Sequence, residues 1–306
     1  MPLPVSDAPQ IASYAIQPSA PSPTSLAIEV SQAVHRINLI NAWGPSGPSP
    51  GHQVLEIGCG QGTCTAALAA AVSWPPASPP AQGPINGHIT ALDPASPTYG
   101  APFTLAQAQS HLSAGPVGSL ITFHRADPVA FLAANPAPRW DTAILAHCIW
   151  YFPSPSTLPE ILTALRGRVS RVCIAEWALR ASQPSAAAHV LAALARATLE
   201  AHKVESEENI RNVVTPAGIK DVVRECGWRV ESEGFVVPER ELADGRWEVG
   251  SVVDEGFVQE VERVEGDRVR ALLRSARDAT VSAAEAVGGV RGVRSMDVWV
   301  ATLVLD

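Results

Sequence analysis

Short apolar runs alternate with segments of helical periodicity between residues 50 and 180. Their length and the turn residues that bound them predict buried strands, and the segments between them predict helices that begin near Thr63, Thr104, Pro128 and Ser156. Because strands alternate with helices, we expect βαβ units and a parallel sheet whose ligand sites lie at the carboxyl ends of the strands. The predicted strands are Gln53–Ile57, His88–Leu92, Leu120–His124, Thr142–Ala146 and Arg171–Ala175.

The pattern continues differently beyond Glu176, where residues 181–235 predict helices over Ser185–His202 and Pro216–Cys226 and a strand over Trp228–Val237. A last strand is predicted at Met296–Val304. The connection between these two strands, residues 240–292, is far longer than a hairpin requires. It contains two amphipathic segments whose apolar sides must be buried, so we expect a helical insertion there.

Before the first strand, residues 1–23 are rich in Pro, Ser and Ala, and we expect them to lack fixed structure of their own. Helical periodicity begins at Leu26, with Thr24 and Ser25 as candidate caps, and the predicted N-terminal helix and its following turn occupy residues 24–50. The proline-rich stretch Trp74–Pro84 predicts a surface loop inserted before the second strand.

Composition narrows the class of protein. The chain of 306 residues is 46% apolar and carries a net charge of −8, which argues against a general nucleic-acid binder. No apolar run is long enough to span a membrane, and the amino terminus has no basic region followed by an apolar one, so we expect a cytoplasmic protein without a membrane partner. The odd number of five cysteines indicates reduced thiols, and no cysteine/histidine cluster predicts a zinc site.

The stretch VLEIGCGQGTCTAALA, residues 54–69, places three glycines where the first strand gives way to a helix. Glycine serves where the backbone turns tightly or a ligand approaches it closely. A dinucleotide fingerprint would require its third glycine at position 63, which is Thr63, and the carboxylate of Glu56 suits a ligand amino group better than a pyrophosphate. A nicotinamide-dependent oxidoreductase is therefore a disfavoured alternative.

The order of strand, acidic residue and GxGxG resembles the first motif of the class I S-adenosylmethionine-dependent methyltransferases. The resemblance extends over residues 50–180, the predicted cofactor-binding core, and returns weakly at the last two strands. It implies a single domain over residues 24–306 with a Rossmann-like, doubly wound α/β fold. The mostly parallel sheet would have seven strands, the last of them antiparallel, with helical additions at the N-terminus and before the last strand. The implied cofactor is S-adenosyl-L-methionine, with S-adenosyl-L-homocysteine as product.

The same resemblance assigns cofactor-binding roles at the ends of successive strands. Asp93 would hold both ribose hydroxyls, and Asp127 would contact the adenine amino group, although an Asp before Pro is also an ordinary helix cap. The glycine loop would pass under the methionine part of the cofactor. The implied cofactor-binding residues are Glu56, Gly58, Gly60, Gly62, Asp93, Asp127 and Ala146.

The acceptor side follows the fourth strand. Ala146-His147-Cys148-Ile149 stands where amino-directed DNA and protein-glutamine enzymes carry an Asn/Asp-Pro-Pro-aromatic box, which argues against those acceptors. No acidic residue closely follows Ala146, so we expect a metal-independent reaction. We expect His147 to act as the catalytic base, since its ordinary pKa lies near neutrality; the alternative is a histidine hydrogen-bonded to backbone at a strand end.

An acceptor pocket is expected from aromatic and acidic residues near this strand end and in the N-terminal segment. Core packing is the alternative for the aromatic residues, and pairing with Arg180 is the alternative for Glu176. The N-terminal helix and part of residues 240–292 are expected to close over the site, although the second could instead pack only on the sheet or on a partner subunit. The expected pocket residues are Tyr14, Trp150, Tyr151, Glu176 and Trp177.

These observations predict an S-adenosylmethionine-dependent methyltransferase that acts on a small-molecule metabolite by in-line displacement at the cofactor methyl group. The alternative is a protein of the same fold that binds the cofactor without methyl transfer, as a regulator or as a different catalyst. The sequence leaves the acceptor, the methylated atom and the oligomeric state open.

Overall fold

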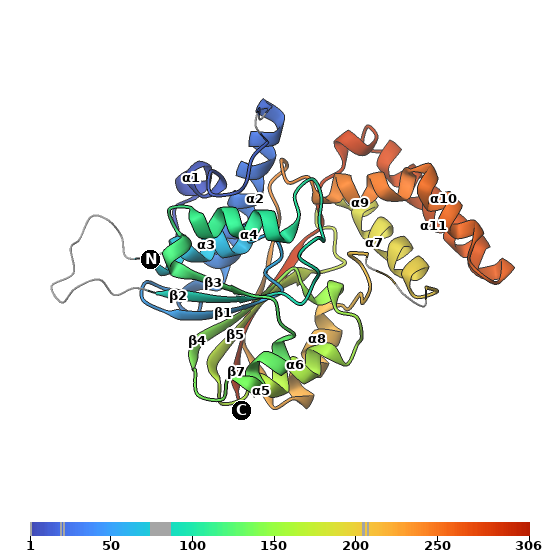
Figure 1. Ribbon diagram of the computed structural model, residues 1–306. Coiled ribbons are helices and arrows are strands. Elements are labelled where there is room, and N and C mark those ends of the chain that lie inside the picture. The colour runs from blue at the N-terminus through green and yellow to red at the C-terminus, as the bar shows by residue number, and fades with distance from the viewer. Residues whose placement is uncertain (1, 19, 21, 74–86, 204–205, 207) are drawn as a thin grey trace.

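The computed structural model describes residues 2–18, 20, 22–73, 87–203, 206 and 208–306. Its strands form one seven-stranded sheet in the order β3-β2-β1-β4-β5-β7-β6 (Figure 1). Neighbouring strands from β3 to β5 are parallel, and β7 is antiparallel to both β5 and β6, which confirms the predicted fold class. The strands are β1 (Gln53–Ile57), β2 (His88–Leu92), β3 (Ile121–His124), β4 (Trp140–Ala146), β5 (Val169–Trp177), β6 (Trp228–Val236) and β7 (Val298–Leu305).

Every strand predicted from the sequence is present, and β4 and β5 extend beyond their predicted ends. The predicted loop Trp74–Pro84 lies outside the described residues. The described helices are α1 (Ala8–Ala12), α2 (Pro23–Ala42), α3 (Thr63–Val72), α4 (Leu105–Ala114), α5 (Pro128–Ala134), α6 (Thr157–Leu165), α7 (Ala187–Glu200), α8 (Pro216–Glu225), α9 (Asp244–Val253), α10 (Glu255–Glu262) and α11 (Asp267–Glu285).

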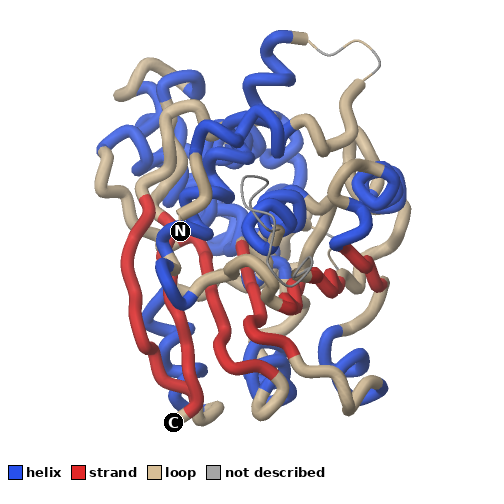
Figure 2. The backbone as a smooth tube through the Cα atoms, turned by 90° about the vertical axis from the view of Figure 1, so that its left-hand side faces the viewer, coloured by secondary structure: helices blue, strands red, loops and turns tan. Residues whose placement is uncertain are grey.

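Helices cover both faces of the sheet. Successive residues of a strand point to opposite faces, so Val54 packs with residues of α2, α3 and α4, whereas Leu55 packs with residues of α5, α6 and α8. Both side chains are fully buried, as expected for parallel strands covered on two sides. Figure 2 shows the strands running side by side, and Figure 1 shows the two helical layers above and below them.

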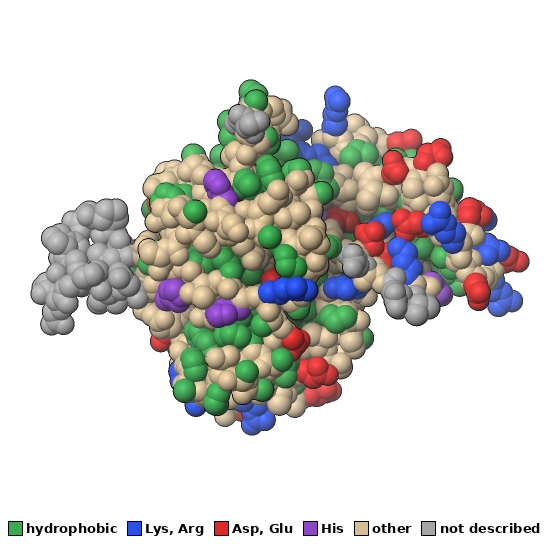
Figure 3. All heavy atoms as spheres, viewed as in Figure 1, with side chains coloured by type: hydrophobic (Ala, Val, Ile, Leu, Met, Phe, Trp, Pro, Cys, Tyr) green, Lys and Arg blue, Asp and Glu red, His purple; other side chains and the backbone are tan. Residues whose placement is uncertain are grey.

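The helical insertion before the last strand does not pack on the sheet. Apolar side chains of α9, α10 and α11, among them Val249, Phe257 and Leu273, form a separate buried cluster with α7. These four helices stand together beside the sheet domain in Figure 1. Figure 3 shows that charged side chains gather at this end of the molecule, over α10 and α11. The apolar faces seen in the sequence therefore bury one another.

The N-terminal segment differs from its prediction. Within residues 1–23, expected to lack structure, a 3-10 turn (Val5–Asp7) and α1 are formed. Ile11 is 3% exposed because it packs in the cluster that contains Ile37 of α2, which the high content of Pro and Ser had concealed. The cap of α2 is Ser22 rather than Thr24 or Ser25, since its hydroxyl accepts a hydrogen bond from the Ser25 amide at 3.0 Å.

In the part of the chain that the structure describes, no helix is both long and apolar enough to cross a lipid bilayer. All five cysteines are buried and none forms a disulfide.

Candidate functional site

The glycine loop turns sharply between β1 and α3. Gly58 and Gly60 have φ angles of +72° and +54°, which disfavour residues with a side chain. A Cβ atom on Gly58 would lie 2.5 Å from Cβ of Cys148, so the loop presses directly against the chain that follows β4. A Cβ atom on Gly60 would meet nothing within 4 Å. The first glycine therefore permits close packing, and the second leaves open space beside the loop.

Asp93 follows β2 and contacts the glycine loop directly. Its Oδ2 accepts a hydrogen bond from the Gly60 amide at 2.8 Å, and its Oδ1 accepts one from the Ala95 amide at 2.9 Å. A carboxylate oxygen can accept a second bond, so both oxygens retain capacity for ribose hydroxyls. The structure thus brings together two elements that the sequence analysis assigned to one ligand.

Asp127 follows β3 and is the N-cap of α5, where its Oδ1 accepts a hydrogen bond from the Ala130 amide at 2.8 Å. The helix-cap alternative is therefore realised, and the adenine contact stays a prediction.

Glu56 lies in β1 with 2% of its surface exposed. The Thr65 hydroxyl donates a hydrogen bond of 2.6 Å to its Oε2, and burial raises the pKa of Glu56 to about 7. A nearby cationic group of a ligand would stabilise the ionised form of this buried carboxyl group. The sequence analysis expected Glu56 to face such a group.

His147 directly follows Ala146, the last residue of β4. Its amide donates to the carbonyl of Ala175 at 2.8 Å, and its φ of +53° is unusual for a residue other than glycine. The imidazole Nε2 lies 2.9 Å from Nε2 of His35, and Nδ1 lies 3.6 Å from Oε1 of Glu176. His147 is thus held by backbone, as its structural alternative supposed, and it also joins a line of titratable side chains.

His35 belongs to α2, and no sequence pattern distinguished it from the other residues of that helix. It is 2% exposed, and burial lowers its pKa well below the ordinary histidine value, as it also does for His147. The charge of Arg36 adds to both shifts. Both imidazoles are therefore neutral at pH 7.

Glu176 near the end of β5 fixes the other side of His147. Its Oε2 accepts from the Ile149 amide and its Oε1 from the Trp177 amide, each at 2.9 Å, and burial raises its pKa to about 7. Its alternative partner Arg180 instead forms an ion pair of 3.2 Å with Asp297.

Of the aromatic residues expected in the pocket, Trp177 contacts the histidine pair, whereas Trp150 and Tyr14 make other contacts. Trp177 lies against His147 with ring centroids 4.4 Å apart and stacks on His35 at 5.9 Å. Trp150 is 2% exposed and donates its indole hydrogen bond to the Val214 carbonyl, as its core-packing alternative supposed. Tyr14 follows α1, where its hydroxyl accepts a hydrogen bond from Gln10.

Helix α9 supplies acidic residues near Tyr151 that the sequence analysis did not single out. Tyr151 is 41% exposed over the whole residue, and burial, followed by the charge of Glu248, raises the pKa of its hydroxyl group. Burial raises the pKa of Glu248 to about 7. Asp244 accepts a hydrogen bond of 2.7 Å from Nε2 of Gln32, which joins α9 to α2.

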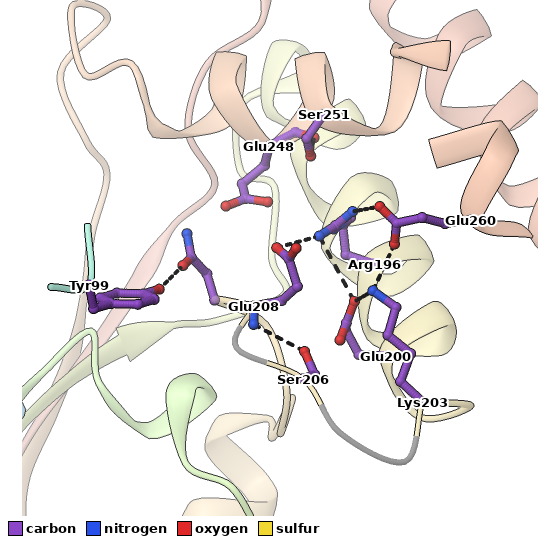
Figure 4. A network of polar contacts seen from close by, with 10 residues as sticks. Tyr99, Arg196, Glu200, Lys203, Ser206, Glu208, Glu248, Ser251 and Glu260 are labelled. Atoms are coloured by element: carbon purple, nitrogen blue, oxygen red, sulfur yellow. Dashed lines mark hydrogen bonds and ion pairs between the residues drawn. The ribbon is translucent and has the colours of Figure 1, made fainter. Parts of the chain in front are cut away.

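A polar network holds the helices around this region (Figure 4). Arg196 of α7 forms an ion pair of 2.7 Å with Glu208, and Lys203 pairs with Glu260 of α10, also at 2.7 Å. Figure 4 shows the carboxylate of Glu248 pointing from α9 toward Glu208 without a dashed contact of its own. Among the residues that the structure describes, no three His, Cys, Asp or Glu side chains are grouped so that they could hold a metal ion.

Known proteins resemble the chain over most of its length, although no family model matches it. It is 34% identical to methyltransferase phomM′ and 33% identical to methyltransferase phomM, both of Diaporthe leptostromiformis. Each alignment spans 289 residues and covers 82% of this chain and 72% of the relative. A cyclopropane-fatty-acyl-phospholipid synthase-like protein from Lactobacillus casei is 26% identical with a TM-score of 0.80, over 98% of this chain and 99% of that one.

Fold, glycine loop and relatives together define the class of protein. The mixed sheet with an antiparallel last strand and a glycine loop at its carboxyl edge is the architecture of a Rossmann-like methyltransferase. Given the identity to the two phomM proteins over four-fifths of its length, the chain belongs to their methyltransferase family.

Proposed function

We propose that this methyltransferase uses S-adenosylmethionine to methylate a small molecule. The observation that carries the proposal is the hydrogen bond between the Gly60 amide and Asp93, because it joins the glycine loop to the carboxylate expected to hold the ribose. Open space beside Gly60 and a buried carboxyl group at Glu56 fit an aminoacyl-adenosine ligand laid across this edge of the sheet.

The cofactor, when bound, supplies an electrophilic methyl group. The protein then has to orient the acceptor in line with that group, exclude water and hold the acceptor's proton. We propose that Trp177 and Tyr151 flank the acceptor, and that the line of Glu176, His147 and His35 holds its proton. In the neutral pair the unused lone pair is on Nδ1 of His35, because Nε2 of each ring faces the other. A proton taken up at His35 Nδ1 would shift the shared proton onto Nε2 of His147, whose positive charge Glu176 would stabilise.

We further propose that α9 forms the outer wall of the acceptor pocket. Support comes from the electrostatic contact of Glu248 with Tyr151 and from the hydrogen bond between Asp244 and Gln32. The carboxyl groups of α9 favour an acceptor that offers hydrogen-bond donors or a positive charge. A small acceptor would suit a pocket that α2 bounds on one side and α9 on the other, since the two helices meet at Gln32 and Asp244.

Ligand binding tests this proposal against the nicotinamide alternative. Calorimetric titration of the purified protein with S-adenosylhomocysteine is expected to show one site per chain, whereas NAD is expected to give no binding heat. Binding of NAD in preference to S-adenosylhomocysteine would reject the proposal.

A further inference from the structure

Arg36 of α2 is a cationic side chain that the structure leaves without a partner. Its Nε and Nη1 atoms are buried and have no hydrogen-bond acceptor, and none of the described carboxylates forms an ion pair with it. The residue as a whole is only partly buried, but its buried Nε and Nη1 groups are charged donors without acceptors, which is costly in an apolar environment. Such a group gains most from a ligand that supplies the missing acceptors.

The position of Arg36 places it at the candidate site. His35, its neighbour in the chain, contacts His147 at the end of β4, and Gln32, one helical turn earlier on the same face, contacts Asp244 of α9. Its positive charge acts on Glu56 in β1, on Glu176 in β5 and on Asp244, and it opposes the effect of burial on the pKa of each. Arg36 therefore lies near the candidate site, within electrostatic range of both the first strand and the acceptor side.

The chemistry of a guanidinium selects the ligand group. It has only donors, so it repels a sulfonium and matches the two oxygens of a carboxylate. The proposed cofactor has one carboxylate, at its methionine end, next to an ammonium group that suits Glu56. A carboxylate on the acceptor is a weaker match, because α9 presents Asp244 and Glu248 on that side.

We propose that Arg36 anchors the carboxylate of the cofactor's methionine end, an assignment that rests on the proposed function. Helix α2 thereby becomes part of the cofactor site, although it precedes the glycine loop in the chain and belongs to none of the motifs that identified that site.

A binding cycle tests this assignment. It uses S-adenosylhomocysteine and its decarboxylated analogue, which keeps the amino group, against the wild-type protein and Arg36→Met. In the wild type, the analogue is expected to bind about 10- to 100-fold more weakly than S-adenosylhomocysteine. Arg36→Met is expected to lose a similar factor for S-adenosylhomocysteine and to bind the analogue as the wild type does.

Two further variants complete the test. Arg229→Met removes an exposed arginine of β6 and should leave both affinities unchanged, and Arg36→Lys should retain part of the discrimination because it keeps the charge. Equal weakening of the binding of both ligands in Arg36→Met, or no weakening of either, would overturn the role of Arg36. The proposal that the protein binds S-adenosylmethionine would still stand. Failure of the wild type to bind S-adenosylhomocysteine would instead reject the proposed function.

Discussion

The Nε2 atoms of His35 and His147 lie 2.9 Å apart, although 112 positions separate the two residues in the chain. At this distance one nitrogen donates and the other accepts, so the pair shares a single proton. The carboxylate of Glu176 beside Nδ1 of His147 favours a proton on that nitrogen, which makes His35 the donor of the pair. This contact binds the N-terminal helix to the end of β4.

Replacing His35 with leucine tests the strength of this contact. The variant leaves Nε2 of His147 buried without a partner, so we expect the free energy of unfolding to fall by about 1–3 kcal/mol in a urea titration. His111→Leu, at an exposed position of α4, is the matched control and should change the value little. Equal effects of the two substitutions would show that the histidine pair contributes no stability.

Gly60→Arg should block the cofactor site. S-adenosylhomocysteine at about 100 times its dissociation constant is expected to stabilise the wild type by about 2.7 kcal/mol, seen as a higher Tm. The arginine would fill the open space beside the loop and remove that shift. Gly167→Arg is the control. Gly167 also has a positive φ, of +67°, and open space around it, but it precedes β5 and so lies at the amino ends of the strands, opposite the glycine loop. A ligand-induced shift that persists in Gly60→Arg would refute the role of the loop.

Asp93→Ala should weaken S-adenosylhomocysteine by about 1.5–3 kcal/mol, the value of hydrogen bonds to a charged group. The 2′-deoxy and 3′-deoxy analogues should then lose little further affinity in the variant, although each binds the wild type more weakly than the parent ligand. Calorimetry with the three ligands measures these differences. Full discrimination against the deoxy analogues in Asp93→Ala would exclude Asp93 as the ribose ligand.

Glu248→Gln should change how stability depends on pH. Burial raises the pKa of Glu248 from 4.5 to about 7, so the folded state binds this proton more tightly than the unfolded state does. The resulting stability is present below pH 4.5 and is lost as the pH rises through about 7. Relative to the wild type, the variant should therefore gain up to about 3 kcal/mol between pH 4.5 and 8. Urea titrations across this range measure the difference, and a constant offset between the two proteins would contradict a buried Glu248.

Local patterns were sufficient to predict the strands and the glycine loop, whereas the antiparallel last strand was implied by the family resemblance. The strands from β1 to β5 are short apolar runs bounded by turns, and Gly58 and Asp93 lie at strand ends that topology brings to one edge. The acceptor side depends on how distant helices dock, which no local pattern encodes. His35 reaches the site only because α2 docks at the end of β4, and Glu248 only because the separate helical cluster brings α9 near Tyr151.

The sequence analysis left two interpretations for several aromatic residues, core packing or pocket lining, and their burial in the structure distinguishes between them. Trp150 and Tyr151 are adjacent in a 3-10 turn, yet the first is buried and the second is 41% exposed. The helical N-terminal segment was missed for a similar reason, since its buried residues Ala8, Ile11 and Ala12 stand in a sequence rich in proline and serine. The sequence alone does not say which of two neighbouring side chains faces the core.

Transfer of an isotopically labelled methyl group tests the central claim most directly. The purified protein is incubated with labelled S-adenosylmethionine and a metabolite extract of the organism that makes it, and both small-molecule and macromolecular fractions are analysed by mass spectrometry. We predict a labelled small molecule together with an equal amount of S-adenosylhomocysteine, and neither product with Gly60→Arg. Label confined to macromolecules, or bound S-adenosylmethionine that is never consumed, would contradict a small-molecule methyltransferase.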